Sequence, residues 1–121
     1  MLKGKKIVLG VTGGIAVYKA VDLVSKLRKE GAEVRVVMTE SAAKFVTPLT
    51  FKEISGNVVA VSMWAEAHEF NVEHIALADW ADLMIIAPAT ANILAKAANG
   101  IADDLLSTVI LASKTPIILC P

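Results

Sequence analysis

The sequence has 121 residues, of which 55% are hydrophobic, and this is enough for one domain whose core needs no disulfide or metal. Twelve basic and twelve acidic residues give a formal net charge of zero without a basic tract, so neither nucleic acid nor an anionic membrane is an expected partner. Cys120 is the only cysteine, which excludes an intramolecular disulfide and a thiolate metal cluster, and no other metal site is expected. No apolar run approaches the ~20 residues of a membrane span. The first six residues lead into a strand pattern without a signal peptide, so we expect a cytoplasmic protein.

The N-terminal part of the chain alternates between strand and helix patterns. Residues 5–11 are almost entirely apolar, as in a buried parallel strand, and residues 33–38 contain the β-branched side chains typical of a second strand. Between them, apolar residues recur at helical spacing over 15–29, and Gly31 follows at a position suited to a left-handed C-cap. Such a strand–helix–strand unit requires a right-handed crossover.

The alternation continues over the rest of the chain. We expect helices at 39–46 (with Thr39 as N-cap), 48–56, 92–99 and 103–112, strands at 57–63, 82–87 and 116–120, and a polar loop at 64–72. The sequence therefore predicts one α/β domain over 1–121, with a doubly wound parallel sheet between two helical layers, a Rossmann-like (flavodoxin-like) fold.

A glycine turn, GVTGGIA at 10–16, joins the first strand to the first helix. Gly13 and Gly14 lack a Cβ and allow the backbone to approach a ligand, the helix N-terminus offers unpaired N–H groups, and Thr12 adds a hydroxyl. These features fit a phosphate monoester. A tight strand-to-helix turn that needs glycine only for packing is the alternative interpretation.

A dinucleotide is less favoured as the ligand of this turn. The spacing G-x-G-x-x-G is absent, and no Lys-Ser or Lys-Thr pair of a P-loop follows. Glu40 follows the second strand, but it is typical of an acid in the first turn of a helix. Its neighbours Thr39 and Ser41 are better suited to hydroxyl contacts with a ligand.

The loop after the strand at 82–87 supports the same interpretation. Pro88 fixes the exit from the strand, Thr90 is placed to cap the next helix, and Asn92 lies in its first turn. Ala87 and Ala89 are small enough for a flat ring to lie against the backbone. The alternative is an alanine-rich connector that carries only a helix cap.

Four segments together resemble the homo-oligomeric flavin-containing cysteine decarboxylases: VTGGIAVYKA, VRVVMTESAAKFVTPLTF, HIALADWADLMIIAPATANILAKAANGIADDLLS and PIILCP. The resemblance is strongest to the branch that decarboxylates 4′-phosphopantothenoylcysteine to 4′-phosphopantetheine in coenzyme A biosynthesis. It implies an FMN-binding domain that assembles into trimers or multiples of trimers. It also implies a possible fusion to a phosphopantothenoylcysteine synthetase domain.

The resemblance further implies roles for individual residues. His74 matches the active-site histidine that acts as acid and base at the cysteine thiol, and His68 has no matched role. The residues that match the flavin-binding segments are Thr12, Gly13, Gly14, Ile15, Thr39, Ser41, Phe45, Ala87, Pro88, Ala89, Thr90, Asn92 and Lys96.

The sequence departs from the family pattern after Pro121. Family members continue with a Pro-Ala-Met-Asn motif whose asparagine holds the substrate carboxylate, so we expect a domain truncated at its C-terminus that binds FMN and lacks this contact. Cys120 lies in an apolar strand and is interpreted as a small core residue. A peptidyl-cysteine decarboxylase, a flavin prenyltransferase, a non-catalytic FMN-binding regulator and a plain phosphate-binding domain are the alternatives.

Overall fold

The structure, a computed structural model, describes residues 1–61 and 76–121. Within these ranges four parallel strands form one sheet in the order β2-β1-β3-β4. The strands are β1 (Lys6–Val11), β2 (Glu33–Met38), β3 (Leu83–Ile86) and β4 (Ile117–Leu119). The chain moves from β1 to β2 on one side and reaches β3 on the other, so the strand order switches between β1 and β3.

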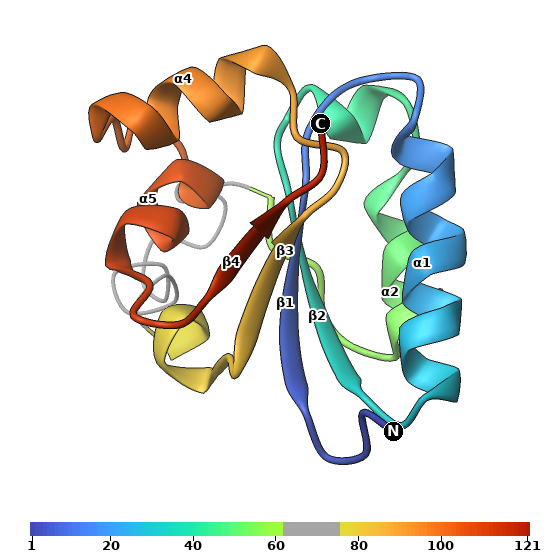
Figure 1. Ribbon diagram of the computed structural model, residues 1–121. Coiled ribbons are helices and arrows are strands. Elements are labelled where there is room, and N and C mark those ends of the chain that lie inside the picture. The colour runs from blue at the N-terminus through green and yellow to red at the C-terminus, as the bar shows by residue number, and fades with distance from the viewer. Residues whose placement is uncertain (62–75) are drawn as a thin grey trace.

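Helices cover both faces of this sheet (Figure 1). One face carries α1 (Val17–Lys29) and α2 (Pro48–Ser55), and the other carries α4 (Ala91–Asn99) and α5 (Leu105–Ala112). Residues 76–80 are also helical. The predicted doubly wound α/β fold is therefore confirmed. No helix in the described ranges is long and apolar enough to cross a membrane.

Because side chains alternate between the two faces of the sheet along each strand, the core consists of two clusters. Successive side chains of a strand point to opposite faces, so Ile7 and Leu9 of β1 pack with the α1–α2 layer while Val8 packs with the α4–α5 layer. All three are buried. This explains why β1 reads as an apolar run rather than as an alternating strand.

Most predicted elements are found with small changes at their ends, but three expectations differ from the structure. The predicted helix at 39–46 is only a 3-10 turn, η1 (Ala42–Lys44). Of the predicted strand at 57–63, the described part contributes one parallel bridge, between Ala60 and Val37, and the predicted loop at 64–72 lies outside the described residues. Cys120 is exposed, so its interpretation as a core residue is wrong, because β4 is the edge strand.

Candidate functional site

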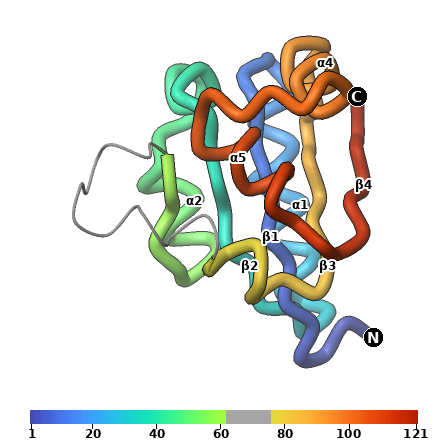
Figure 2. The backbone as a smooth tube through the Cα atoms, turned by 90° about the vertical axis from the view of Figure 1, so that its left-hand side faces the viewer, coloured from blue at the N-terminus to red at the C-terminus, as the bar shows by residue number. Residues whose placement is uncertain are grey.

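A cavity of ≈ 380 Å³ lies at the carboxyl edge of the sheet, at the switch between β1 and β3. Figure 2 shows that the segments following β1, β2 and β3 lie at the same edge. The cavity falls within the range of about 300–1,000 Å³ that is typical of small-molecule sites. It is lined by Thr12, Gly13, Thr39, Glu40, Ser41, Val61, Thr90, Asn92, Ile93, Asp103, Asp104 and Leu105.

Thr12 joins the loop after β1 to the loop after β3. Its hydroxyl donates a hydrogen bond to the carbonyl oxygen of Pro88 and accepts one from the N–H of Thr90, at 3.0 Å. Only 2% of Thr12 is exposed. Its hydroxyl proton is therefore engaged within the protein, and Thr12 shapes the cavity wall more than it offers a free donor to a ligand.

Gly13 joins the same loop to the loop after β2. A Cβ added at Gly13 would lie 2.6 Å from the Cβ of Ser41 and 2.9 Å from its carbonyl carbon, so the two backbones meet only because position 13 has no side chain. A Cβ added at Gly14 would meet nothing within 4 Å. The packing interpretation of the glycine turn thus holds for Gly13, while Gly14 leaves open space.

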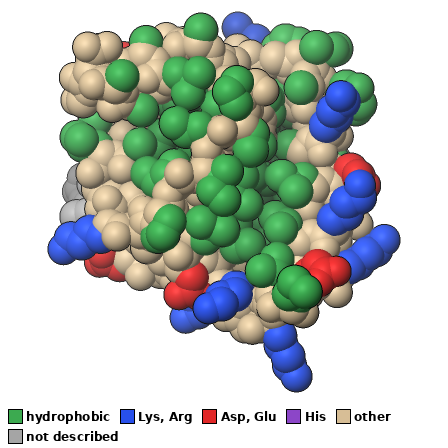
Figure 3. All heavy atoms as spheres, in the orientation of Figure 1, with side chains coloured by type: hydrophobic (Ala, Val, Ile, Leu, Met, Phe, Trp, Pro, Cys, Tyr) green, Lys and Arg blue, Asp and Glu red, His purple; other side chains and the backbone are tan. Residues whose placement is uncertain are grey.

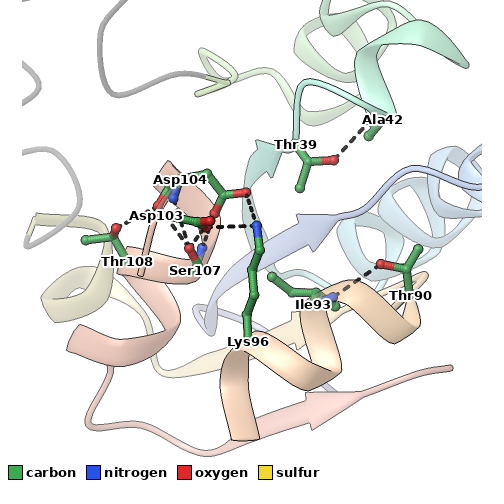
Figure 4. A network of polar contacts seen from close by, with 9 residues as sticks. All are labelled: Thr39, Ala42, Thr90, Ile93, Lys96, Asp103, Asp104, Ser107 and Thr108. Carbon is green, nitrogen blue, oxygen red and sulfur yellow. Dashed lines mark hydrogen bonds and ion pairs between the residues drawn. The ribbon is translucent and has the colours of Figure 1, made fainter. Parts of the chain in front are cut away.

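The helices α1, α4 and α5, whose N-termini lie beside the cavity, differ in how their first N–H groups are paired. Thr90 caps α4 by accepting from the N–H of Ile93 at 3.4 Å, and Asp104 caps α5 (Figure 4). The N-terminus of α1 has neither a side-chain cap nor an acidic residue in its first turn. Of these three N-termini beside the cavity, the amides after Gly13 are therefore the best suited to an anionic group.

The opposite wall of the cavity carries a cluster of charges (Figure 4). The Nζ atom of Lys96 lies 2.8 Å from Oδ1 of Asp103 and 3.5 Å from Oδ2 of Asp104. The hydrogen bond with Lys96 lowers the pKa of Asp103 below its ordinary value of 3.8. The same bond raises the pKa of Lys96 above 10.5, against the opposing effect of desolvation. Carboxylates held ionised beside the cavity accept hydrogen bonds from N–H groups of a ligand and repel its anionic end.

Six of the residues matched by the family resemblance line this cavity: Thr12, Gly13, Thr39, Ser41, Thr90 and Asn92. Ile15 and Phe45 are 78% and 51% exposed, and Ala89 is buried in the core. Ala87 and Pro88 line a separate groove of ≈ 180 Å³ against α1. Lys96 contacts the wall through Asp103 and Asp104, whereas Gly14 does not line the cavity. His74 lies outside the described residues.

Sequence reasoning missed part of the lining. Glu40 was interpreted only as a first-turn acid, and Val61, Ile93, Asp103, Asp104 and Leu105 were not expected at the site. The pair of acids before the apolar run at 105–112 is a recognisable N-cap signal. That this cap reaches the cavity depends on how the segment between α4 and α5 folds back, which no local pattern encodes.

An open parallel sheet with a ligand cavity at the strand switch defines an α/β protein of the class that binds phosphate-bearing cofactors. The chain matches the model of the Flavoprotein family over residues 1–121, and it belongs to this family.

Three similar proteins extend this comparison. The chain is 55% identical, over 99% of its length, to the coenzyme A biosynthesis bifunctional protein CoaBC of Haemophilus influenzae. The structural alignment with the FMN-dependent cysteine decarboxylase SpaF covers 98% of this chain and 69% of that one, with a TM-score of 0.86 and 35% identity. A PPC decarboxylase mutant complexed with pantothenoylaminoethenethiol aligns with a TM-score of 0.75 and 31% identity, over 93% of this chain and 64% of that one. The chain spans about 30% of the length of the curated relative.

Proposed function

We propose that this chain binds FMN in the cavity at the carboxyl edge of the sheet. The observation that carries the proposal is the convergence of the loops after β1, β2 and β3 on one cavity beside the uncapped N-terminus of α1. The family and the FMN-dependent decarboxylase SpaF support it. When bound, FMN supplies reversible two-electron oxidation and reduction, which the side chains of this protein lack.

The residues present fit such a cofactor. The backbone from Gly13 to Ile15 and the hydroxyls of Thr39 and Ser41 would hold the phosphate. Thr39 already accepts a hydrogen bond from the N–H of Ala42, at 3.1 Å, so its hydroxyl proton remains to be donated. We place the ring system toward the segment 87–92 and the carboxylates of the opposite wall. Phe45 remains proposed as a further flavin-binding residue, and Lys96 is proposed to act on this site through its contacts with Asp103 and Asp104.

We propose that the reaction is the FMN-dependent decarboxylation of 4′-phosphopantothenoylcysteine. The carboxylate leaves as carbon dioxide, a proton takes its place, and 4′-phosphopantetheine is the product without net oxidation. The 55% identity to a coenzyme A biosynthesis protein and the structural similarity to a PPC decarboxylase support this substrate. Cysteine at the end of a peptide is the second candidate substrate, favoured by the higher TM-score with the cysteine decarboxylase SpaF.

His74 is proposed as the acid and base at the cysteine thiol. Neutral imidazole has an unperturbed pKa of about 6.5, close to cytoplasmic pH, so it both removes and returns a thiol proton. The proposal rests on the sequence match and on this chemistry, because residue 74 lies outside the described ranges.

Substitution of His74 by Asn tests this role. Decarboxylation is followed as carbon dioxide release from 4′-phosphopantothenoylcysteine and, in parallel, from a peptide with a C-terminal cysteine. The assay uses protein extended as far as the reading frame continues beyond codon 121. We expect His74→Asn to lower kcat by about 10²- to 10⁴-fold with FMN retained. His68→Asn, the matched control, keeps the wild-type rate. Equal rates for the two variants would contradict the role assigned to His74. Turnover of the peptide but not of 4′-phosphopantothenoylcysteine would show that the peptide is the substrate.

We further propose a homotrimer, or a multiple of trimers, with a fused synthetase domain. Hydrophobic side chains gather on the face of the molecule that carries β4 (Figure 3), where Ile118 and Leu119 are exposed. Apolar surface of this kind is typical of an interface. The bifunctional relative and the 30% of its length that the chain spans support the fusion. Light scattering at micromolar concentration tests the assembly, and a monomer would contradict it.

A further inference from the structure

Lys96 makes polar contacts with both ends of the segment that joins α4 to α5. Its backbone carbonyl oxygen accepts the N–H groups of Gly100 and Ile101, the latter at 2.9 Å, and this ends α4. Its side chain reaches across to Asp103 and Asp104, where the segment enters α5. One residue therefore closes a loop of which the last two residues line the cavity.

Asp104 has a separate task for each of its carboxylate oxygens. Oδ1 accepts from the N–H of Ser107 at 2.8 Å and also from its hydroxyl, while Oδ2 faces Lys96. The N–H of Asp104 donates to Oγ of Ser107 at 3.1 Å, which completes a capping box, and Ser107 is buried. Asp104 thus couples the ammonium group of Lys96 to the start of α5 (Figure 4).

The ammonium group of Lys96 is shielded, although the carboxylates it contacts are more open. Only 16% of the Lys96 side chain is exposed, against 61% for Asp103 and 36% for Asp104. Two of the three N–H donors of this ammonium group face carboxylates, and Lys96 does not line the cavity, so it is less well placed to bind a ligand directly. It is well placed to neutralise and hold the carboxylates of the wall.

We propose that Lys96 is a positioning residue, which holds Asp103 and Asp104 in place as a wall of the cavity and does not itself bind the cofactor. This inference rests on the proposed binding of FMN and deepens it. Without the ammonium group, two uncompensated carboxylates would border a cavity that takes an anionic cofactor, and the segment 100–104 would lose its anchor. The effect of Lys96 on FMN therefore passes through the two aspartates.

A double-mutant cycle separates this role from direct binding. Lys96→Met is made in the wild-type chain and in an Asp103→Asn/Asp104→Asn background, where asparagine keeps the cap of α5. FMN affinity is measured by quenching of flavin fluorescence. We expect Lys96→Met to weaken binding on the order of tenfold in the wild-type chain, the usual worth of charge-assisted hydrogen bonds, and less than about threefold in the neutral background. Lys96→Arg, which also pairs with carboxylates, restores most of the affinity.

The matched control is Lys26→Met on α1. Lys26 forms an exposed ion pair with Asp22 at 2.9 Å. The substitution Lys26→Met removes this ion pair, which lies away from the cavity, and is therefore expected to leave FMN affinity unchanged. An equal loss from Lys96→Met in both backgrounds would make Lys96 a direct ligand and overturn the inference. So would undiminished binding by Lys96→Met in the wild-type chain.

Amide hydrogen exchange in the FMN-free chain gives a second readout. Lys96→Met is expected to speed exchange of Ile101 and of the N-terminal amides of α5 and to leave α1 unchanged. Wild-type protein that takes up no FMN would contradict the proposed function. In that case unchanged exchange in the variant would overturn the role of Lys96 as well, whereas faster exchange would uphold its role in holding the wall.

Discussion

At the scale of single residues, the hydroxyl of Thr12 is the connection on which the shape of the cavity depends most directly. It donates to the carbonyl oxygen of Pro88 and accepts from the N–H of Thr90, and so joins the loop after β1 to the loop after β3, whose two contacting residues are 76 and 78 positions away in sequence. Both loops line or border the proposed flavin site. The loss of this one oxygen would leave the N–H of half-buried Thr90 without this partner.

Substitution of Thr12 by Val tests this connection. Valine has a similar shape but no hydroxyl, so we expect the free energy of unfolding to fall by about 0.5–1.5 kcal/mol, the usual net contribution of a hydrogen bond in a protein. Thr12→Ser keeps the hydroxyl and serves as the control, with a smaller loss. Urea denaturation followed by circular dichroism measures both. A Val variant as stable as the Ser variant would show that the hydrogen bonds contribute nothing net.

Gly13 and Gly14 provide a second comparison between neighbouring residues. A Cβ at Gly13 would collide with Ser41, including its backbone, whereas a Cβ at Gly14 would meet open space. We expect Gly13→Ala to lower the free energy of unfolding by about 1–3 kcal/mol. Gly14→Ala should change it by less than about 0.5 kcal/mol. Thermal melts of the FMN-free proteins measure both, and equal melting temperatures would contradict the close contact between the two loops.

At the scale of elements, the segment between α4 and α5 makes stability depend on pH. The pKa of Asp103 is lowered by Lys96, so its contribution is complete above its ordinary value of 3.8 and is lost as pH falls through the lowered value. The pKa of Lys96 is raised, so its contribution is complete below 10.5 and is lost as pH rises through the raised value. Asp104, the other charged group facing Lys96, shares in the same pairing.

The melting temperature as a function of pH tests this expected dependence of stability on the Lys96–Asp103 ion pair. We expect the difference between the wild-type protein and Lys96→Met to be largest between about pH 5 and pH 9, and to shrink in more acidic and more alkaline solution. Lys26→Met, which removes an exposed pair, provides the baseline. A difference that stays constant from pH 3 to pH 11 would mean that the ion pair does not contribute to folding.

The elements also show what the sequence can and cannot predict. The strand β2 was predicted with its observed bounds, because its β-branched residues and flanking turns are local signals. The helix expected at 39–46 shrinks to η1, since local cap signals do not say how many turns the tertiary packing will support. The bridge of Ala60 to Val37 likewise depends on a neighbouring strand rather than on its own sequence.

The residues of the candidate site show the same difference between local signals and tertiary packing. The glycine turn and Thr90 were recognised from local patterns, whereas Asp103 and Leu105 enter the cavity only through the packing of α5. In that packing the side chain of Leu106 lies close over Gly10, where an added Cβ would lie 2.6 Å from its Cδ1. A contact between residues so distant in sequence leaves no periodic signal in either segment.

At the scale of the whole molecule, the parallel strands bring their carboxyl ends to one edge of the sheet. A ligand that contacts the loops after three of these strands therefore stabilises the folded arrangement of the whole sheet. A ligand that binds only the folded state stabilises it by about 2.7 kcal/mol at a concentration of 100 Kd. FMN is therefore expected to raise the melting temperature of the chain by several degrees. NADH should not do so, because the glycine spacing of a dinucleotide site is absent.

Hydrogen exchange with and without FMN tests the convergence itself. Protection should rise together in 12–15, 39–41 and 89–92, because these segments line or adjoin one cavity. The turn between α1 and β2, at the opposite edge of the sheet, serves as an internal control and should keep its exchange rate. Protection of one loop alone would mean that the other two do not contact the cofactor. The three loops would then share an edge of the sheet without sharing a ligand, and the proposed FMN site would be wrong.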